Sequence, residues 1–384
     1  MRGLLIRPAG VPVLICFEDP NPQLWDGACE AWASLEPEQI EDGIAQVIDG
    51  IRLVVLSPRS DSEVQADYAR ALEVSVINSR NLAWAAETLT VQVTMHLLKA
   101  YAGRKHLLHA AALASPKTGQ TVALVAASGT GKTTAARFLG RHFTYLSDET
   151  AVIDVGTLRV SPYPKPLSVI EEVGQAKKQY DPAERGLTVA EPDQDFRLGY
   201  LVILDRDKAG KAALSWERVP LAEALFALVE QSSGVQRMPR GLAQFADLVN
   251  SVGGAIRLTY SEITDTLVFF QDLLAGELDL ASHQADYTFV ETGQAEVNSV
   301  SGVCYRRAPG TSGLETGEDF LVASQGKLTR TSLIGWDIWE ALAHPLSADD
   351  LHAVMVTLYG PVPRPEFDRA LEHLVGAGII ELVG

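Results

Sequence analysis

Cysteine is scarce in this 384-residue chain, which contains only Cys16, Cys29 and Cys304. The three cysteines are an odd number, they are widely spaced, and no CxxC pair occurs among them. This pattern excludes a disulfide framework and a paired-cysteine metal motif. A reducing compartment is the simplest setting for such a chain, so we expect a cytoplasmic protein.

Positive charge is also scarce. Lys and Arg total 32 against 49 Asp and Glu, which gives a net charge of −17. A field of this sign repels nucleic acids and anionic lipid surfaces. We therefore expect neither nucleic acid nor a membrane among the partners.

Long uninterrupted apolar runs are missing as well. Arg7, Pro8 and Pro12 break up the apolar N-terminal residues, so we expect neither a signal segment nor a membrane span. The remaining composition, 47% hydrophobic and 21% charged residues, is that of an ordinary globular protein. Its length predicts two or three domains.

One stretch carries a recognisable motif, VALVAASGTGKTT over residues 122–134. Its apolar start predicts a buried strand, its glycines predict a loop, and a helical pattern begins at Thr134. A strand, a glycine-bearing loop ending in Lys-Thr, and a helix make up the P-loop pattern, in which backbone N–H groups cradle phosphates at a helix N-terminus. The alternative is a glycine-rich turn before an ordinary helix.

The P-loop interpretation assigns a role to each residue of the loop. Lys132 would reach the β- and γ-phosphates and the Thr133 hydroxyl would ligate Mg²⁺, so we expect ATP and Mg²⁺ as cofactors. Ala126 replaces the first glycine of the strict pattern, at little cost if its torsions are those of a strand. The expected nucleotide-binding residues are Ala127, Ser128, Gly129, Thr130, Gly131, Lys132, Thr133 and Thr134.

An acidic pair, Asp148 and Glu149, follows the predicted P-loop helix at the end of a short strand. Phosphoryl transfer needs a carboxylate for Mg²⁺ and often a second one that orients the nucleophile. The pair could supply both functions, with either residue in either role. The alternative is a solvated acidic turn.

These features together resemble a known family. His109, the loop Ser128–Thr133 and the acidic pair occur in the order and near spacing of bacterial HPr kinase/phosphorylase. The chain resembles more closely the HPr-kinase-like proteins of peptide natural-product clusters, which often read Leu-His-Ala-Ala before the P-loop, as Leu108–Ala111 does. The resemblance implies a P-loop core like that of phosphoenolpyruvate carboxykinase.

The same resemblance implies roles for individual residues. Lys132 and Thr133 would bind Mg-ATP, Asp148 would serve the metal, and Glu149 would act as the base toward a substrate hydroxyl. His109 would lie beside the transferring phosphate. Glu149 stands where the family usually has Asp, and no copy of the family's downstream phosphorolysis signature is found. These two departures favour kinase activity over the reverse reaction.

Two further residues have alternative interpretations. Lys165, inside the Pro-rich segment 162–166, either clamps phosphate or is solvated. Asp205 follows an apolar run as a Walker-B acid would, but we interpret it as structural because the acidic pair already fills that role and a polar hairpin turn follows. Residues 171–199 are charged and mixed, which favours a flexible loop on the substrate side.

The coarse secondary structure is that of an α/β protein. Expected helices lie at 24–35, 40–48, 67–72, 82–102, 134–139, 222–229, 242–252 and 264–274. Expected strands lie in 1–19 and at 52–57, 74–77, 109–113, 122–126, 200–205, 216–219 and 256–260, with 216–219 returning beside 200–205. The expected domains are 1–81, an α/β region of unknown role; 82–281, the kinase domain; 282–296, an irregular linker; and 297–384, a separate C-terminal domain.

The C-terminal residues predict short strands followed by three helices. Asp319–Val383 resembles PqqD and related domains of ribosomal peptide biosynthesis, which look like winged helix-turn-helix folds but bind the leader of a precursor peptide by strand addition. DNA binding is disfavoured by Asp349 and Asp350 on the second helix. Trp336 and Trp339 are expected to pack in the core.

The sequence as a whole predicts an ATP-dependent kinase that phosphorylates a Ser or Thr hydroxyl of a ribosomally made precursor peptide. The C-terminal domain would capture the leader peptide, and the chain could form a homo-oligomer. One alternative is an enzyme that activates a carboxylate or a small-molecule hydroxyl with ATP. Another is a non-catalytic adaptor that nucleotide binding switches between conformations.

Overall fold

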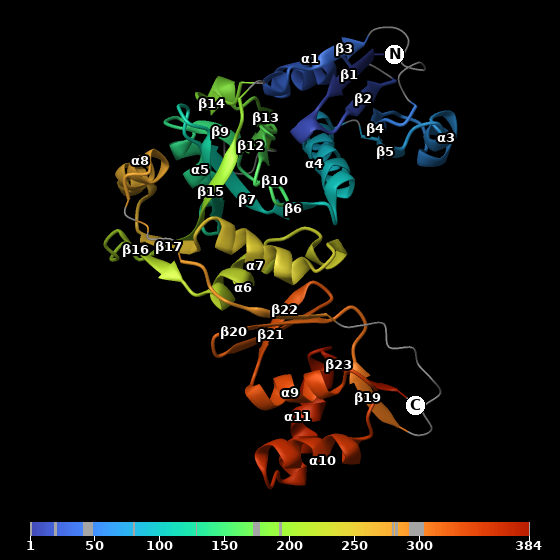
Figure 1. The fold of residues 1–384 in the computed structure, drawn as a ribbon. Helices are drawn as coiled ribbons and strands as arrows, with labels where there is room; N and C mark the ends of the chain where they lie inside the picture. Colours follow the sequence, from blue (N-terminus) through green and yellow to red (C-terminus); the bar gives the residue numbers. More distant parts are fainter. Residues whose placement is uncertain are drawn as a thin grey trace. The chain divides into compact units, whose positions relative to one another are not determined.

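A computed structural model of the chain shows a mixed α/β protein with several sheets (Figure 1). The structure describes residues 2–18, 21–40, 49–79, 81–127, 129–171, 177–191, 194–278, 280, 283–291 and 303–383. The chain divides into two compact units. The first comprises Met1–Trp216 and Leu258–Asp279, and the second Glu217–Arg257 and Leu280–Gly384.

The first unit begins with a five-stranded sheet. Its strands, in order across the sheet, are β3 (Glu38–Ile40), β1 (Arg2–Ile6), β2 (Val13–Phe17), β4 (Arg52–Leu56) and β5 (Glu73–Ile77). β1 and β2 are antiparallel, whereas β2, β4 and β5 run parallel to one another. Every residue of β2 is buried, as expected for a parallel strand covered on both faces.

Three helices accompany this sheet: α1 (Pro22–Ala31), α3 (Asp61–Asp67) and α4 (Leu82–Tyr101). Asn81 caps α4, accepting a hydrogen bond at Oδ1 from the Trp84 backbone at 3.1 Å. The buried face of α4 includes His96, which is 1% exposed and whose Nε2 lies 3.1 Å from the Leu53 carbonyl. His96 is therefore a packing residue.

The P-loop motif lies in a seven-stranded sheet. In order, its strands are β14 (Thr188–Val189), β9 (Thr144–Ser147), β7 (Ala110–Ala114), β8 (Gln120–Val125), β15 (Arg197–Arg206), β17 (Ala255–Tyr260) and β16 (Ser215–Val219). β8 is antiparallel to β7 and parallel to β15. The apolar residues of β8 are buried, and its two neighbouring strands hold its end in place for the loop that follows.

Further elements complete the first unit. α5 (Lys132–Leu139) packs against β7, and α8 (Leu267–Ala275) packs against β8. A three-stranded sheet has the order β11 (Val160–Ser161), β10 (Ala151–Asp154) and β6 (Lys105–Leu108), and a two-stranded sheet pairs β12 (Leu167–Val169) with β13 (Lys178–Tyr180). No helix in the described residues is long and apolar enough to cross a membrane.

Several expectations for the first unit are wrong. The helix expected at 67–72 is instead α3, because Ser60 and Glu63 form a capping box that starts the helix earlier. β16 does not return beside β15, because β17 lies between them. The segment 171–199 contains β13 and β14 among its described residues instead of one irregular loop. Of the helix expected at 40–48, Ile40 ends β3 and residues 41–48 lie outside the described residues.

The second unit contains two helices of the chain's middle, α6 (Leu221–Glu230) and α7 (Gly241–Ser251), and three C-terminal helices, α9 (Leu333–Ala341), α10 (Ala348–Tyr359) and α11 (Arg364–Gly376). Its four-stranded antiparallel sheet has the order β18 (Thr288–Glu291), β20 (Ser312–Thr316), β21 (Asp319–Ser324) and β22 (Lys327–Thr331). β19 (Cys304–Arg307) pairs with β23 (Ile380–Val383).

Two tryptophans form the centre of this unit's core. Trp336 and Trp339 are 3% and 0% exposed, with ring centroids 5.3 Å apart, which confirms that they pack inward. A Cβ on Gly313 would lie 2.6 Å from atoms of both rings, so the strand beneath them needs glycine at this position. β20 was not expected from the sequence, and β18 lies in the segment expected to be an irregular linker.

Candidate functional site

The loop between β8 and α5 has the backbone expected of a phosphate-binding loop. Gly129 and Gly131 have φ values of 76° and 98°, which L-residues with a Cβ rarely adopt. Gly131 is the N-cap of α5 and offers no side-chain cap to the helix. The first N–H groups of α5 therefore remain available to an anion. Ser128 lies outside the described residues.

Ala126, which replaces the first glycine of the strict motif, fits without strain. It is 3% exposed, and it is not one of the described residues with positive φ. Its carbonyl accepts a hydrogen bond from Lys132 Nζ at 3.0 Å. The methyl group is therefore tolerated, as the sequence predicted.

Lys132 is buried at the mouth of the loop, with 7% exposure. Its ammonium donates hydrogen bonds to the carbonyls of Ala126 and His109, the latter at 2.8 Å. Burial lowers the pKa of Lys132 to about 8, and the carboxylates of Glu149 and Asp148 oppose this shift only in part. No ion pair of Lys132 occurs among the described residues, so an arriving phosphate would be its direct anionic partner.

The other loop residues present polar groups outward. Thr133 and Thr134 are exposed, so their hydroxyls are accessible from solvent. Thr130 donates its hydroxyl to the Ala127 carbonyl at 2.6 Å, which closes the turn of the loop. The described members of the expected nucleotide-binding set thus lie on one loop and the first turn of α5.

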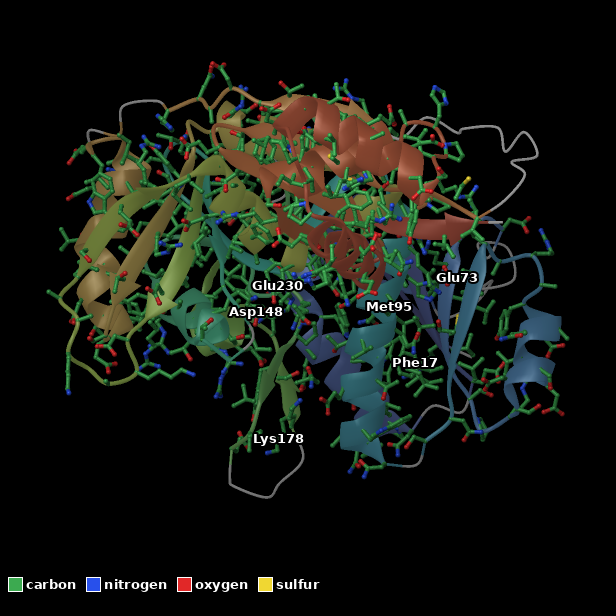
Figure 2. All side chains as sticks on the ribbon, turned by 90° about the horizontal axis from the view of Figure 1, so that it is seen from below. Phe17, Glu73, Met95, Asp148, Lys178 and Glu230 are labelled. Carbon is green, nitrogen blue, oxygen red and sulfur yellow. The ribbon has the colours of Figure 1, made fainter. Side chains whose placement is uncertain are left out.

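The acidic pair is held in a tight turn after β9. The hydroxyl of Ser147 accepts hydrogen bonds from the backbone N–H groups of Glu149 and Thr150, at 3.2 and 3.0 Å. Asp148, which is labelled in Figure 2, is 5% exposed. Its Oδ1 accepts no hydrogen bond in the described part of the structure. The alternative of a solvated acidic turn is therefore wrong for Asp148.

Lys165 completes the cluster. It is 5% exposed, and its Nζ lies 3.0 Å from Glu149 Oε2 and 3.5 Å from Asp148 Oδ1. The alternative of a solvated lysine is wrong. Burial alone would lower the pKa of Lys165, but the two carboxylates outweigh it and the pKa is raised. Burial alone would raise the pKa of Glu149, but chiefly Lys165 outweighs it and the pKa lies below its usual value.

His109 stands between β6 and β7 and is exposed to solvent. Partial desolvation and then the neighbouring Lys132 ammonium lower the pKa of its imidazole, while Glu149 and its backbone oppose the shift. The imidazole is therefore neutral at pH 7. The fold thus brings four expected residues, His109, Lys132, Asp148 and Glu149, together with Lys165.

The oxygen ligands in this site fit Mg²⁺. Asp148 Oδ1 is a buried acceptor without a hydrogen bond, and the Thr133 hydroxyl is exposed at the start of α5. Magnesium usually binds one or two carboxylates together with substrate phosphates and water, and seldom a cage made only of protein groups. The described residues contain no group of three or more His, Cys, Asp or Glu side chains placed to hold a metal.

Sequence reasoning missed one cation near the loop. Arg206, at the end of β15, was assigned to a polar hairpin turn, but its side chain lies beside Gly131. The register of β15 with β8 was the missing information, because no local pattern pairs the two strands. Asp205 is exposed and accepts a hydrogen bond from Thr259 at 3.3 Å, in keeping with a structural role.

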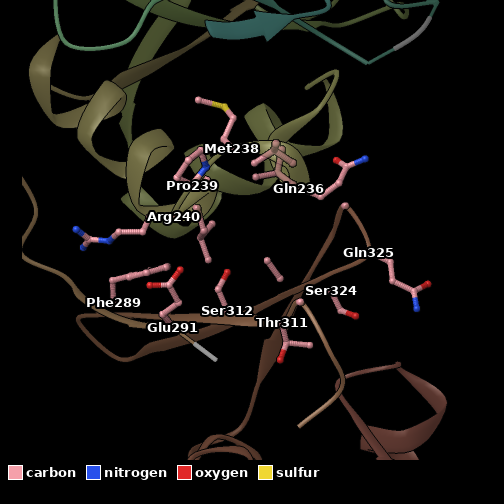
Figure 3. Close-up of a pocket in the computed structure, with 17 residues that line it drawn as sticks. Gln236, Met238, Pro239, Arg240, Phe289, Glu291, Thr311, Ser312, Ser324 and Gln325 are labelled. Atoms are coloured by element: carbon pink, nitrogen blue, oxygen red, sulfur yellow. The ribbon is translucent and has the colours of Figure 1, made fainter. Parts of the chain in front are cut away.

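Two cavities lie away from these residues. One in the first unit, of about 530 Å³, is bounded by α1, α4 and β13 and is mostly apolar. The other, of about 210 Å³, lies in the second unit (Figure 3). There Met238 and Arg240 on the helical side face Phe289 and Ser312 on the sheet side. Neither cavity is lined by the P-loop or by the acidic pair.

Comparison with known proteins adds little to this description. No protein-family model and no curated protein matches the sequence. The solved structures that resemble it include the Hpr(Ser) kinase/phosphatase from Coxiella burnetii, at 12% identity, covering 44% of this chain and 98% of that chain, with a TM-score of 0.23. A TM-score this low does not establish a common fold.

Proposed function

We propose that this chain is a kinase that transfers the γ-phosphoryl group of ATP to a hydroxyl group. The observation that carries the proposal is the cluster of Lys132, Asp148, Glu149 and Lys165 at a glycine-bearing loop and helix N-terminus. A loop of this kind suits the nucleotide phosphates, and an acidic pair next to it suits metal binding and nucleophile orientation.

Each residue of the cluster would have a separate role in the reaction. Backbone N–H groups of the loop and Lys132 would hold the phosphates, and Thr133 and Asp148 would hold Mg²⁺, which would supply charge neutralisation for the phosphates. The acceptor oxygen forms a bond to the γ-phosphorus as the bond to the ADP oxygen breaks, and the hydroxyl proton passes to Glu149. Glu149, whose pKa burial alone would raise but chiefly Lys165 holds below its usual value, is the carboxylate assigned to accept that proton.

Lys165 would keep this machinery in position. Its Nζ contacts both carboxylates and is buried among them, so it fixes their spacing and offsets their mutual repulsion. His109, neutral and exposed at the mouth, would contact the transferring group from the solvent side. This arrangement supports the roles expected from the sequence, with Asp148 at the metal and Glu149 at the acceptor.

We further propose that the acceptor is a Ser or Thr hydroxyl of a precursor peptide whose leader binds the second unit. β22 is an edge strand, and none of its five residues is buried. An edge strand offers unpaired backbone groups to an extended peptide, and side-chain pockets then select the sequence. Such capture would raise the effective concentration of the acceptor hydroxyl at the kinase site.

Mass spectrometry tests the proposal. Full-length protein is incubated with Mg-ATP and a candidate precursor peptide, with Lys132→Met as the control. We expect a mass gain of about 80 Da, one phosphoryl group, on the peptide with the wild type only. A leader-only peptide should compete and raise the KM for the full precursor. Unchanged peptide with bound ATP would favour the adaptor, and transfer only to small molecules would favour the other enzyme.

A further inference from the structure

We infer that Arg206 is a second phosphate-binding cation of the P-loop, and that its guanidinium contacts the β-phosphate of the bound nucleotide. This inference rests on the proposed function. It begins with strand register: β15 runs parallel to β8, and Ile203 pairs with Val125. Parallel neighbours end at the same edge of a sheet, so Arg206 and the loop after Val125 emerge side by side.

The side chain of Arg206 reaches the loop at its last glycine. A Cβ on Gly131 would lie 3.8 Å from Arg206 Nη1 and 3.9 Å from its Cδ. Gly131 is the N-cap of α5, where the backbone N–H groups available to an anion converge. A phosphate held by those groups would therefore lie within reach of the guanidinium.

The guanidinium is oriented by the protein before any ligand binds. Its Nε donates to the Ser261 carbonyl at 3.0 Å, and its Nη2 lies 3.4 Å from the 66% exposed carboxylate of Glu262. Among the described residues, Nη1, the atom nearest Gly131, has no hydrogen-bond acceptor. The Nε bond ties β15 to the chain at Ser261 and leaves Nη1, on a side chain that is 33% exposed, accessible to a ligand.

The surroundings of Arg206 Nη1 indicate the chemistry of the ligand. An Arg fork matches phosphate oxygens in geometry and charge. In a P-loop, the backbone cradles the α- and β-phosphates while the Lys reaches the β- and γ-phosphates. A guanidinium beside Gly131 is thus placed for the β-phosphate, which ATP and ADP share.

The test is nucleotide affinity, measured by titration of the full chain with ATP and with ADP. In Arg206→Met we expect the Kd of both nucleotides to rise by the same factor, about 10- to 100-fold, the usual range for losing a charge-assisted hydrogen bond. Arg206→Lys keeps the charge but not the fork, and should lose a smaller factor. Thermal unfolding checks that both variants are folded.

Arg159→Met is the matched control, because Arg159 lies beside the amino end of β15 and forms an exposed ion pair with Asp195 at 2.9 Å. Its nucleotide affinities should equal those of the wild type. Unchanged affinity in folded Arg206→Met, or a loss for ATP alone, would overturn the β-phosphate contact while leaving the proposed function standing. Absence of ATP and ADP binding by the wild type would overturn the proposed function and this inference together.

Discussion

Two sheets of the first unit carry a cluster of charged residues at the ends of parallel strands. The two clusters differ in how many of their charged groups have hydrogen-bond partners. At the N-terminal sheet, Glu18 follows β2 and accepts hydrogen bonds from Ser57, Arg59 and Tyr68. Within the described residues of the P-loop sheet, Asp148 Oδ1 accepts no hydrogen bond and has an ion-pair contact with Lys165 at 3.5 Å, and the hydrogen bonds of Lys132 go to backbone carbonyls.

The difference indicates what each cluster is for. In the N-terminal cluster, which is partly buried, the hydrogen bonds to Glu18 are made within the protein, and such a network stabilises the fold. A buried carboxylate oxygen without a hydrogen bond and an ammonium whose pKa is lowered to about 8 cost the protein stability, and such costs are typical of functional sites. The N-terminal cluster is therefore structural, and the P-loop cluster is the candidate for chemistry.

The largest effect that this comparison predicts is that of Lys132→Met. Phosphoryl transfer should fall by about a thousandfold or more, because the cation nearest the phosphates is lost. The melting temperature should stay the same or rise, since a costly buried charge is replaced by an apolar chain of similar length. Turnover and thermal unfolding of the same sample check this, and full activity in a folded variant would contradict the site assignment.

Glu149→Gln should slow catalysis next most strongly, by about a hundred- to ten-thousandfold, as expected for a lost base. ATP affinity should barely change, because Glu149 is assigned to the acceptor hydroxyl and not to the metal. Single-turnover rates and ATP titration separate the two effects. If affinity collapsed while bound ATP still turned over, the roles of Asp148 and Glu149 would be exchanged.

Glu18→Gln should affect stability and leave catalysis unchanged. Loss of charge-assisted hydrogen bonds should lower the free energy of unfolding by about 1–3 kcal/mol, as measured by urea denaturation. Burial alone would raise the pKa of Glu18, but its bonds to Arg59, Ser57 and Tyr68 lower it below 4.5. This contribution is therefore present above about pH 4.5 and lost as the pH falls through the lower folded-state value. A change in kcat would show that the N-terminal cluster is functional after all.

The smallest predicted effect concerns pH. The pKa of Lys132 is about 8 in the free protein, and bound phosphate favours the ammonium, so ATP binding at pH 8 should take up about half a proton. Affinity should therefore fall as the pH rises from 7 to 9, by at most about tenfold per unit. Calorimetry in two buffers of different ionisation enthalpy measures the uptake. The same uptake in Lys132→Met would assign the proton to another group.

Local sequence patterns predicted the parts of the structure that depend only on residues close together in the chain. The strand, loop and helix around Gly131 follow from apolar runs and positive φ, and the inward packing of Trp336 and Trp339 follows from helical spacing. β20 could not be predicted in this way, because Gly313 weakens the strand pattern. The glycine is needed only because two tryptophan rings lie above it.

The rest of the site depends on contacts between residues that are far apart in the sequence. Lys165 is buried only because the chain after β10 and β11 returns to the acidic turn, and lysine is ordinarily a surface residue. The prolines on either side of it, Pro164 and Pro166, were the available signal, since they make the segment rigid. The position of Arg206 beside the loop depends on which strand lies next to β8, and no sequence pattern specifies that neighbour.

The central claim is that the incompletely bonded cluster at the P-loop is a nucleotide phosphate site. Isothermal titration of the full chain with Mg-ATP tests it most directly, with Lys132→Met and Glu18→Gln as paired variants. The account predicts one-to-one binding in the wild type and in Glu18→Gln, and loss of binding in Lys132→Met. Absence of binding in the wild type, or equal binding in all three proteins, would contradict it.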